Sequence, residues 1–439
     1  MKKIVALALT ALIVLTMALT GCGKSGDTTG QSSQETTGQA ATSTTQGKSE
    51  PVTLKFMHYQ SEGQEVFTKI VDDFMAANSN IKIEADLSGG DQYKTILKTK
   101  FAAGEAADIV GVHPGMAYAI AFAKAGYLED LTNEAFMKDI DEGAKRMATD
   151  NGKVYALPID ASYIATLYNK DIFARNNLSV PKTWKEFLDV CGKLKQNNIT
   201  PIAIGNKDLW VTQIIPFAIA PTVIYSGNIN FDSDMYAGKT KFNGPEWQKI
   251  LEMQMELNKN KYFNDGVLST TYDQANALFA QGKAAMTVMG TWVLNPIKEM
   301  NKDINIGLFV FPASEDGNNW ASSAVGGMLG IYANSPHKAE AKKFLEFFMS
   351  KDVYSNYLRS TSNFPTVKGV TVDFDPAAQE LSSQVTNTYN FLDQNWPAGV
   401  QDTLFKSIQE NFAGKDTKAV LEQLDKEWAN RTKNQAITK

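Results

Sequence analysis

Hydrophobic and polar residues alternate along two short segments near the start of the folded part of the chain, residues 52–59 and 81–87. Such alternation predicts β-strands, because successive side chains of a strand point to opposite faces. Helical spacing of apolar residues predicts helices over 64–77 and 92–103, and the apolar run 108–112 predicts a third strand. Strands that alternate with helices form parallel sheets with right-handed crossovers, so we expect an α/β protein.

Similar patterns continue toward the end of the chain. Thr183 with Glu186 three residues later predicts a capping box at a helix start, and Ser335 before Pro336 predicts another start, with Pro at the first helical position. Cys191 shares the apolar face of the first of these helices, so we expect a buried core thiol and not a nucleophile. The remaining predicted elements are an extended segment over 151–159, strands over 201–204 and 284–289, and helices over 246–258, 272–279 and 416–429.

The amino-terminal residues form a separate segment. Lys2 and Lys3 precede an apolar run over 4–19, which has the composition of a signal peptide and is short for a membrane span. The run ends in Leu-Thr-Gly before Cys22, which resembles the bacterial lipoprotein box. The resemblance implies removal of residues 1–21 and diacylation of Cys22, with palmitate among the expected acyl groups. An ordinary secretory signal with an incidental cysteine is the alternative.

Two further observations concern this segment. A G-x-G-x-x-G match overlaps the cysteine, but no strand precedes it and no helix follows it in the predicted pattern, so we do not interpret it as a dinucleotide loop. Residues 22–50 are rich in Ser, Thr, Gly and Gln. Such a segment cannot bury enough surface to offset its ordering entropy, so we expect a flexible tether with a mean reach of about 30 Å.

Composition narrows the function classes. The chain has 439 residues, of which 43% are hydrophobic and 10% aromatic, enough for a globular body of two or more domains. The formal net charge of −5 argues against a nucleic-acid partner. The three histidines have no cysteine or histidine at ligand spacing, so we expect no metal site. We expect no cofactor either.

Four segments in a fixed order carry a resemblance to a known family. They are GKVYALPIDASYIATLYNKDIF, PKTWKEFLDVCGKL, FAQGKAAMTVMGTWVLN and GGMLGIYANSPHKAEAKKFLEFFMS. Together with the lipobox, the tether and the predicted βαβαβ start, they resemble the family 1 extracellular solute-binding proteins of ABC importers, in particular the large group that carries sugars. The resemblance covers about residues 52–430.

The resemblance implies a two-lobe, periplasmic-binding-protein-like fold of type II, with a ligand cleft between two α/β lobes. It implies three crossings between the lobes, near residues 160–163, 325–328 and 363–367. The expected lobes are 52–160 plus 327–364 for the N-terminal lobe and 161–326 plus 365–439 for the C-terminal lobe.

Sugar recognition sets which residues to look for. A sugar ring offers C–H faces that stack on aromatic rings, and hydroxyls that pair with polar side chains. In the resembled family a Trp at the Met-Gly-Thr-Trp motif is often a stacking plate, which implies that role for Trp292. Trp210 follows a loop after a predicted strand, and Trp396 lies in a loop without periodicity. Packing in a lobe core is the alternative for each.

Polar candidates lie at strand ends and crossings, because ligands of parallel sheets bind beyond the carboxyl ends of the strands. For His58 the alternative is a residue at a strand end whose hydrogen bonds are already satisfied. For Glu62 and Asp273 the alternative is a helix cap, and for Asp160 it is a hydrogen bond at the hinge. We expect no catalytic residue. The full set of expected ligand-binding residues is His58, Gln60, Glu62, His113, Asp160, Trp210, Asp273, Trp292, Asn363 and Trp396.

These observations predict a lipid-anchored, monomeric sugar receptor on the outer face of the membrane of a Gram-positive cell. Its hinged lobes are expected to close on a neutral mono- or oligosaccharide and then dock on the permease subunits of an ABC importer. The scarcity of Lys and Arg among the candidates favours a neutral ligand. The alternatives are the same fold with a polyamine, peptide, polyol phosphate or metal chelate as solute, a surface glycosidase with two carboxylates, and an adhesion module. We expect no enzymatic activity.

Overall fold

The computed structural model describes most of the chain, namely residues 51–60, 63–89, 92–370 and 372–433. The predictions made for residues 1–50, including those for Cys22, and for Glu62 lie outside these ranges. Within them, every helix is too short or too polar to cross a membrane.

The predicted βαβαβ start is confirmed to within two residues at each end. β1 (Val52–Met57) pairs in parallel with β2 (Ile81–Asp86) on one side and with β3 (Ile109–Val112) on the other. The crossovers are α1 (Gln64–Ala77) and α2 (Tyr93–Ala103), and each buries the apolar residues that recur at helical spacing. The amphipathic pattern therefore fixes both the elements and the face that each of them buries.

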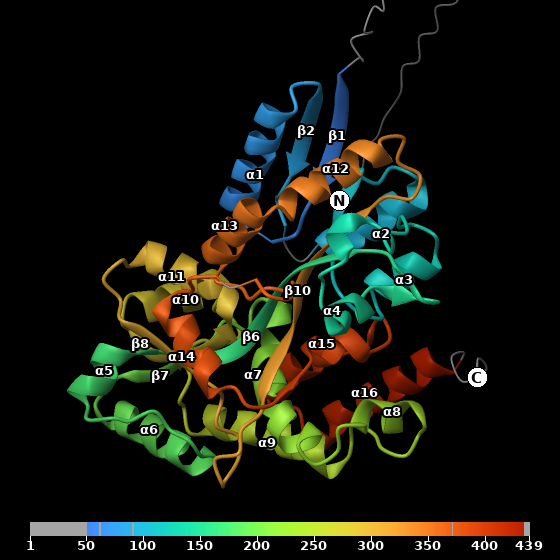
Figure 1. Ribbon diagram of the computed structural model, residues 1–439. Helices are drawn as coiled ribbons and strands as arrows, with labels where there is room; N and C mark the ends of the chain where they lie inside the picture. Colours follow the sequence, from blue (N-terminus) through green and yellow to red (C-terminus); the bar gives the residue numbers. More distant parts are fainter. Residues whose placement is uncertain (1–50, 61–62, 90–91, 371, 434–439) are drawn as a thin grey trace, which may run out of the picture. The chain divides into compact units, whose positions relative to one another are not determined.

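Two long antiparallel strands connect the halves of the protein. They are β6 (Leu157–Asn169) and β10 (Ala321–Ile331). β10 pairs with β3, whereas β6 pairs with β8 (Ala284–Gly290). In the described part of the chain nine strands thus form one sheet, with β2-β1-β3-β10-β6-β8-β7 as its main path, β11 beside β10 and β9 beside β6. Figure 1 shows β6 (green) and β10 (orange) running from the blue strands toward the green and yellow elements.

The third crossing joins the same strands. Ala161 of β6 is paired with Val325 of β10 and forms an isolated antiparallel bridge with Phe364, with N–H···O distances of 2.8 and 2.7 Å. The three predicted crossings therefore lie side by side and are hydrogen-bonded to one another. The resemblance implied crossings at these positions, and it did not show that two of them lie within continuous strands.

The remaining elements surround the two ends of this sheet. The first half contains α3 (Ala119–Lys124), η2 (Ala135–Met137), α4 (Glu142–Arg146), β4 (Thr149–Asp150), β5 (Lys153–Val154), α12 (Lys338–Phe348) and α13 (Lys351–Thr361). The second half contains α5 (Lys170–Arg175), α6 (Trp184–Gln196), β7 (Thr200–Ala203), η3 (Leu209–Gln213), α7 (Ile214–Ala220), η4 (Pro221–Tyr225), α8 (Phe231–Tyr236), α9 (Pro245–Lys259), α10 (Tyr272–Ala280), η5 (Thr291–Val293), α11 (Leu294–Met300), β9 (Ile306–Phe309), α14 (Pro376–Gln384), β11 (Thr388–Tyr389), η6 (Leu392–Asn395), α15 (Val400–Phe412) and α16 (Thr417–Thr432).

Buried hydrophobic side chains form two separate clusters, as a two-lobe fold requires. One cluster draws on residues 54–159 and 325–358, and the other on 164–313 and 364–428. We refer to the parts around them as the first and second lobe. The lobe boundaries given above remain a prediction, and the division between these clusters supports it.

The helix α6 shows how far local signals reach. The Thr183 hydroxyl accepts a hydrogen bond from the N–H of Glu186 (3.2 Å), as predicted. The Glu186 carboxylate, however, accepts from the N–H of Lys182 (2.7 Å), one residue before the cap, so the reciprocal half of the capping box is displaced. Cys191 is fully buried in this helix, and burial raises the pKa of its thiol, which confirms the prediction of an inert core residue.

The start of α12 differs from the prediction. This helix begins at Lys338 and not at Pro336. The Ser335 hydroxyl accepts from the N–H of His337 (3.0 Å) and donates to the buried carboxylate of Asp108 (2.6 Å). The hydroxyl therefore pairs with the turn before the helix and with Asp108, and the helix starts two residues later than the sequence pattern predicted.

The carboxylate of Asp160 holds the crossings together. Its Oδ1 accepts from the N–H of Gly327 (2.8 Å), and its Oδ2 accepts from the Tyr357 hydroxyl (2.5 Å) and from Asn363 Nδ2 (2.8 Å). Burial raises the pKa of Asp160, and the hydrogen bonds from Tyr357, Asn363, Gly327 and Gln60 oppose that rise. Asp160 is fully buried, so the structure gives it the hinge role that was the alternative to ligand contact.

We expect Asp160→Ala to lower the free energy of unfolding by about 2–5 kcal/mol, because three buried donors lose their acceptor. Urea unfolding followed by circular dichroism measures the change. Asp72→Ala, at an exposed position of α1, is the matched control and should stay within about 0.5 kcal/mol of the parent protein. Equal unfolding midpoints for Asp160→Ala and the parent would contradict the hinge role.

Candidate functional site

A cavity of about 520 Å³ lies where the two lobes and the crossings meet. Its volume is within the range of roughly 300–1,000 Å³ that is typical of small-molecule sites. The first lobe contributes Tyr59, Gln60, Lys94, His113 and Pro114 to its lining. The crossings contribute Ser162, Val325, Gly326, Thr361 and Asn363. The second lobe contributes, among others, Asp208, Trp210, Gln213, Tyr272, Asp273, Trp292, Phe391, Asp393, Gln394, Gln401 and Asp402.

One wall of the cavity is aromatic and belongs to the second lobe. The ring centroids of Trp210 and Tyr272 are 4.9 Å apart, those of Trp210 and Trp292 are 6.4 Å apart, and those of Trp292 and Phe391 are 6.3 Å apart. A Cβ atom at Gly290 would lie 2.0 Å from the indole of Trp292. The glycine of the Met-Gly-Thr-Trp motif is therefore required, because the indole lies directly against the backbone at the end of β8.

Tyr59 and His113 of the first lobe line the cavity as part of a stack of three rings. The Tyr59 ring lies between His58 (4.8 Å) and His113 (3.8 Å), and its hydroxyl donates to the Gly326 carbonyl (3.0 Å). His58 is fully buried against Gly111, where a Cβ atom would lie 2.6 Å from the imidazole. Burial lowers the pKa of His58 to about 3. His58 is outside the described cavity lining, so the structure corrects its assignment from ligand contact to a neutral support behind Tyr59.

A polar network occupies the wall near α2 and α15. Lys94 Nζ donates to Gln401 Oε1 (3.2 Å), and Gln401 Nε2 donates to Asp393 Oδ2 (2.6 Å). Burial raises the pKa of Asp393 to about 6, although Lys94 and the hydrogen bonds lower it. The pKa of His113 is well below its ordinary value because of burial and, secondarily, because of Lys94 and His58. His113 therefore presents a neutral imidazole to the cavity.

The charged groups of the lining are mostly acidic. Among the described lining residues, one carries an ammonium group, Lys94, and four carry carboxylates, namely Asp208, Asp273, Asp393 and Asp402. An anionic solute would call for Arg or several Lys. The lining thus disfavours a phosphate or carboxylate ligand and offers many hydrogen-bond acceptors.

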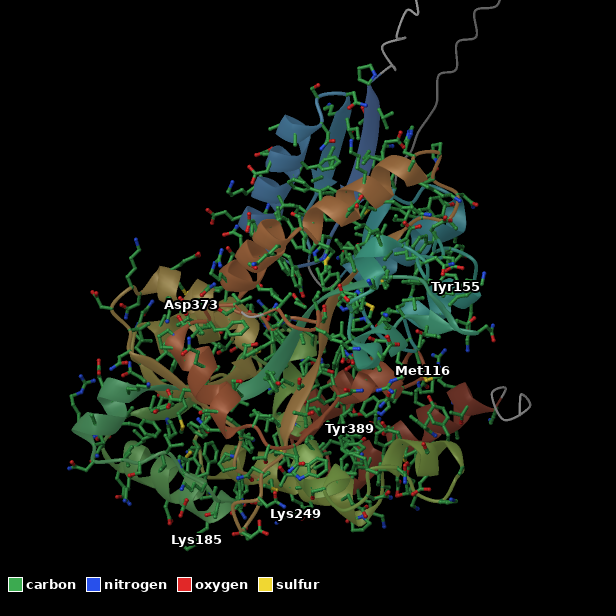
Figure 2. All side chains as sticks on the ribbon, in the orientation of Figure 1. Met116, Tyr155, Lys185, Lys249, Asp373 and Tyr389 are labelled. Atoms are coloured by element: carbon green, nitrogen blue, oxygen red, sulfur yellow. The ribbon has the colours of Figure 1, made fainter. Side chains whose placement is uncertain are left out.

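The two lobes also touch each other directly. The N–H of Met116 in the first lobe donates to the Gln394 carbonyl (2.9 Å), and the Tyr236 hydroxyl lies 3.5 Å from the Met116 sulfur. Figure 2 shows Met116 close to where the cyan ribbon of the first lobe approaches the second. At another place Asn295 Nδ2 donates to the Arg359 carbonyl (3.0 Å). Residues of the two lobes are therefore in contact at two places besides the crossings.

Six predicted site residues are brought together in the cavity lining, although their role there stays a prediction. They are Gln60, His113, Trp210, Asp273, Trp292 and Asn363.

Trp396 is placed elsewhere. It is 2% exposed and packs against Phe217, Phe242 and Trp247 in the core of the second lobe, with centroid distances of 6.0, 5.3 and 5.8 Å. The structure therefore corrects its assignment from stacking plate to core residue.

Sequence reasoning missed several lining residues for identifiable reasons. Asp393 and Gln394 are neighbours of Trp396 in a loop already noted for its lack of periodicity, and that signal could have found them. Tyr59 adjoins His58 at the end of β1, where the strand-end rule also applies. Lys94 and Ser162 lie within a helix and a strand, and only the tertiary structure directs them to the cavity.

Known proteins resemble this chain in sequence and fold. The sequence profile of the bacterial extracellular solute-binding proteins matches residues 60–354. The multiple sugar-binding protein of Streptococcus mutans serotype c is 26% identical over 388 residues, which are 87% of this chain and 91% of that protein. The melibiose/raffinose/stachyose-binding protein of Bacillus subtilis strain 168 is 23% identical over 317 residues, 69% of this chain and 71% of that protein. A structure of a Bacillus licheniformis sugar transporter in complex with stachyose has a TM-score of 0.75 at 22% identity, covers 86% of this chain and 100% of its own, and has the same fold.

Asp393 makes the stability of the protein without solute depend on pH. Its folded pKa of about 6 is above the ordinary value of 3.8, so the folded state is penalised once the carboxylate ionises, and stability should fall as pH rises from about 4 to 6. Asp393→Asn removes this penalty. We expect a higher melting temperature than the parent at pH 8 and no difference at pH 4, measured by calorimetry without solute. A variant that melts below the parent at pH 8 would contradict the raised pKa.

Proposed function

This chain belongs to the bacterial extracellular solute-binding proteins, and on that premise we propose that its solute is a sugar or short oligosaccharide. The observation that carries the proposal is the combination of aromatic rings and polar side chains around one cavity. The second lobe supplies the aromatic wall of Trp210, Tyr272, Trp292 and Phe391 together with most of the lining carboxylates and amides, and the first lobe adds polar groups such as Gln60. The names of the relatives described above support a saccharide ligand.

The chemistry of the two walls matches that of a pyranose. Aromatic faces are electron-rich and attract the polarised C–H groups of a sugar face. Amide, imidazole and carboxylate groups opposite them pair with the hydroxyls at the ring edge. Both lobes line the cavity, so the solute makes all of these contacts only when both lobes reach it.

This requirement links binding to lobe closure. A solute that contacts both lobes shifts the population toward the closed state by its difference in affinity for the two states. The crossing strands β6 and β10 and the segment at Phe364 are the connections about which the lobes move. The closed receptor then docks on the permease of an ABC importer, which opens the lobes and takes the sugar.

The amino-terminal segment completes the proposed function. Acylation of Cys22 anchors the receptor to the outer face of the membrane of a Gram-positive cell, and the tether over 22–50 lets it reach the permease. The lipobox letters before Cys22 and the composition of the tether support this arrangement. The receptor acts as a monomer.

The charge of the cavity lining favours a second candidate solute, a polyamine or another cation. Four carboxylates face Lys94 in the lining, and aromatic rings attract cations as well as C–H groups. Calorimetry with spermidine and putrescine beside the saccharides separates the two candidates.

We expect Trp292→Ala to weaken saccharide binding at least about 100-fold, because buried aromatic contacts account for a large share of binding energy. Isothermal titration calorimetry with raffinose, stachyose, maltotriose, xylotriose and chitotriose measures the change. Trp396→Phe is the control, since Trp396 lies in the core, and it should keep the parent affinity. An unchanged affinity of Trp292→Ala would remove the aromatic wall from the proposed site.

We expect Cys22→Ala to release the mature protein from membranes, because the variant lacks the cysteine that carries the anchoring acyl chains. Fractionation of cells expressing the full chain, followed by immunodetection, measures the distribution. Ser25→Ala, a change within the tether that leaves the cysteine in place, is the control and should remain with the membrane. Membrane retention of Cys22→Ala would exclude the lipoprotein assignment and leave the sugar-binding proposal untouched.

A further inference from the structure

Three residues that line the cavity each have a buried polar atom without a hydrogen-bond partner among the described residues. These atoms are Ser162 Oγ, Asn363 Oδ1 and Gln394 Oε1. Their residues are 0%, 2% and 3% exposed. An unpaired buried polar atom costs free energy, so folded proteins keep such atoms few. Three around one cavity point to a partner that the chain itself does not supply.

These atoms are grouped at the crossing strands. Ser162 of β6 is paired with Ala324 of β10, two residues before Gly326. A Cβ atom at Gly326 would lie 2.4 Å from Asp160 Oδ1 and 3.2 Å from Ser162 Oγ. A glycine at this position therefore lets the Asp160 carboxylate and the Ser162 hydroxyl lie close to the backbone of β10, and we call Ser162, Asn363 and Gln394 the floor of the cavity.

The orientation of the Asn363 amide is fixed by its surroundings. Its Nδ2 donates to Asp160 Oδ2 at 2.8 Å, and the same carboxylate oxygen accepts from the Tyr357 hydroxyl. A carboxylate accepts hydrogen bonds and does not donate them. The NH₂ group must therefore face Asp160, and the remaining group of the amide is the acceptor Oδ1.

The Gln394 amide is fixed in the same way by a different partner. Its Nε2 donates to the backbone carbonyl of Val325 at 2.9 Å. A carbonyl also only accepts, so the group left over is again an oxygen, Oε1. The backbone of Gln394 is held by the first lobe, because its carbonyl accepts from the N–H of Met116. The amide therefore cannot turn over without losing its hydrogen bond to the Val325 carbonyl.

Resting on the proposed function, we propose that this floor selects solutes that present two hydrogen-bond donors to Asn363 Oδ1 and Gln394 Oε1. The Ser162 hydroxyl both donates and accepts, so it adapts to either kind of group. The amide oxygens do not adapt. A sugar with hydroxyls at both places fits, whereas an analogue with fluorine or an ether oxygen there leaves both partners unsatisfied.

Asp160 acts in this selection as a positioning residue. In Asp160→Asn the side-chain oxygen must remain at Gly327, because a backbone N–H at 2.8 Å cannot turn away. The new NH₂ group then faces Asn363, whose amide must turn over and present Nδ2 to the cavity. One acceptor of the floor becomes a donor although no lining residue has been replaced.

The test uses calorimetry with the full mature chain. Raffinose, stachyose, maltotriose, xylotriose and chitotriose are titrated first, and monodeoxyfluoro analogues of the tightest binder follow. Fluorine replaces a hydroxyl but cannot donate. We expect at least two positions at which the analogue binds about 10–100-fold more weakly than the parent sugar.

Variants then assign these positions. We call the loss of affinity caused by fluorine at a given sugar position the fluorine penalty. Asn363→Leu should abolish this penalty at one position, and Gln394→Met should abolish it at another. Each variant removes the amide oxygen, so no acceptor is left without a donor when fluorine replaces the hydroxyl. Asp160→Asn should reduce the fluorine penalty at the same sugar position as Asn363→Leu. The parent sugar should still bind to this variant, because its hydroxyl can also accept a hydrogen bond from the turned amide. Gln281→Met, an exposed position of the second lobe, is the control and should leave every penalty unchanged.

The outcomes separate the two proposals. Binding of a saccharide with fluorine penalties that no floor variant changes, or with no penalty at any position, overturns the floor and leaves sugar binding in place. Absence of binding for every saccharide overturns the proposed function and the floor assignment that rests on it. The proposal for the floor is supported when replacement of Asn363 changes the fluorine penalty at one position and replacement of Gln394 changes it at another.

Discussion

The hydrogen bonds to the buried carboxylate of Asp160 are the interaction on which the rest of the structure depends. This one group accepts from β10 at Gly327, from α13 at Tyr357 and from the third crossing at Asn363. A buried carboxylate is stable only when its oxygens are fully paired. The three connections between the lobes are thus held in one arrangement by an electrostatic requirement, and the cavity lies next to that arrangement.

The hydrogen bonds at the crossings and the cavity lining share residues, which under the proposed function links binding directly to lobe movement. Asn363 is bound to Asp160 and lines the cavity, and Gln60 contributes in the same two ways. A solute held by these amides therefore acts on the groups that fix the crossings. Coupling of this kind needs no long pathway, because ligand and hinge contact the same side chains.

The glycines and aromatic residues of the site work together. Gly290 allows the indole of Trp292 to lie against the backbone, and Gly326 allows the Asp160 carboxylate to lie close to β10. The aromatic wall supplies apolar contact, while acceptors dominate the remaining lining. Buried acceptors lower the stability of the protein without solute. Asp393 is an example, because its carboxylate is buried with a raised pKa where a neutral residue would be more stable. Groups that destabilise the empty protein in this way are typical of binding sites.

The sequence by itself determined the elements and the family. Amphipathic and alternating patterns placed β1, α1 and β2 to within two residues, because burial of one face dictates those periodicities. Four short segments were enough to indicate two lobes with a cleft. The sequence also named Trp292 and Asn363, which adjoin a strand end or a crossing where a ligand is expected, and the structure places both in the cavity lining.

Only the tertiary structure decided which neighbouring side chain faces the cavity. His58 and Tyr59 are adjacent, yet the imidazole of His58 packs against Gly111 and Tyr59 lines the cavity. In the loop before Trp396 the polar Asp393 and Gln394 face the cavity and the indole enters the core. Local patterns carry no information on such choices, because they depend on packing and hydrogen bonds between residues far apart in the chain. The same holds for the direction of the Asn363 and Gln394 amides, which Asp160 and Val325 fix from other strands.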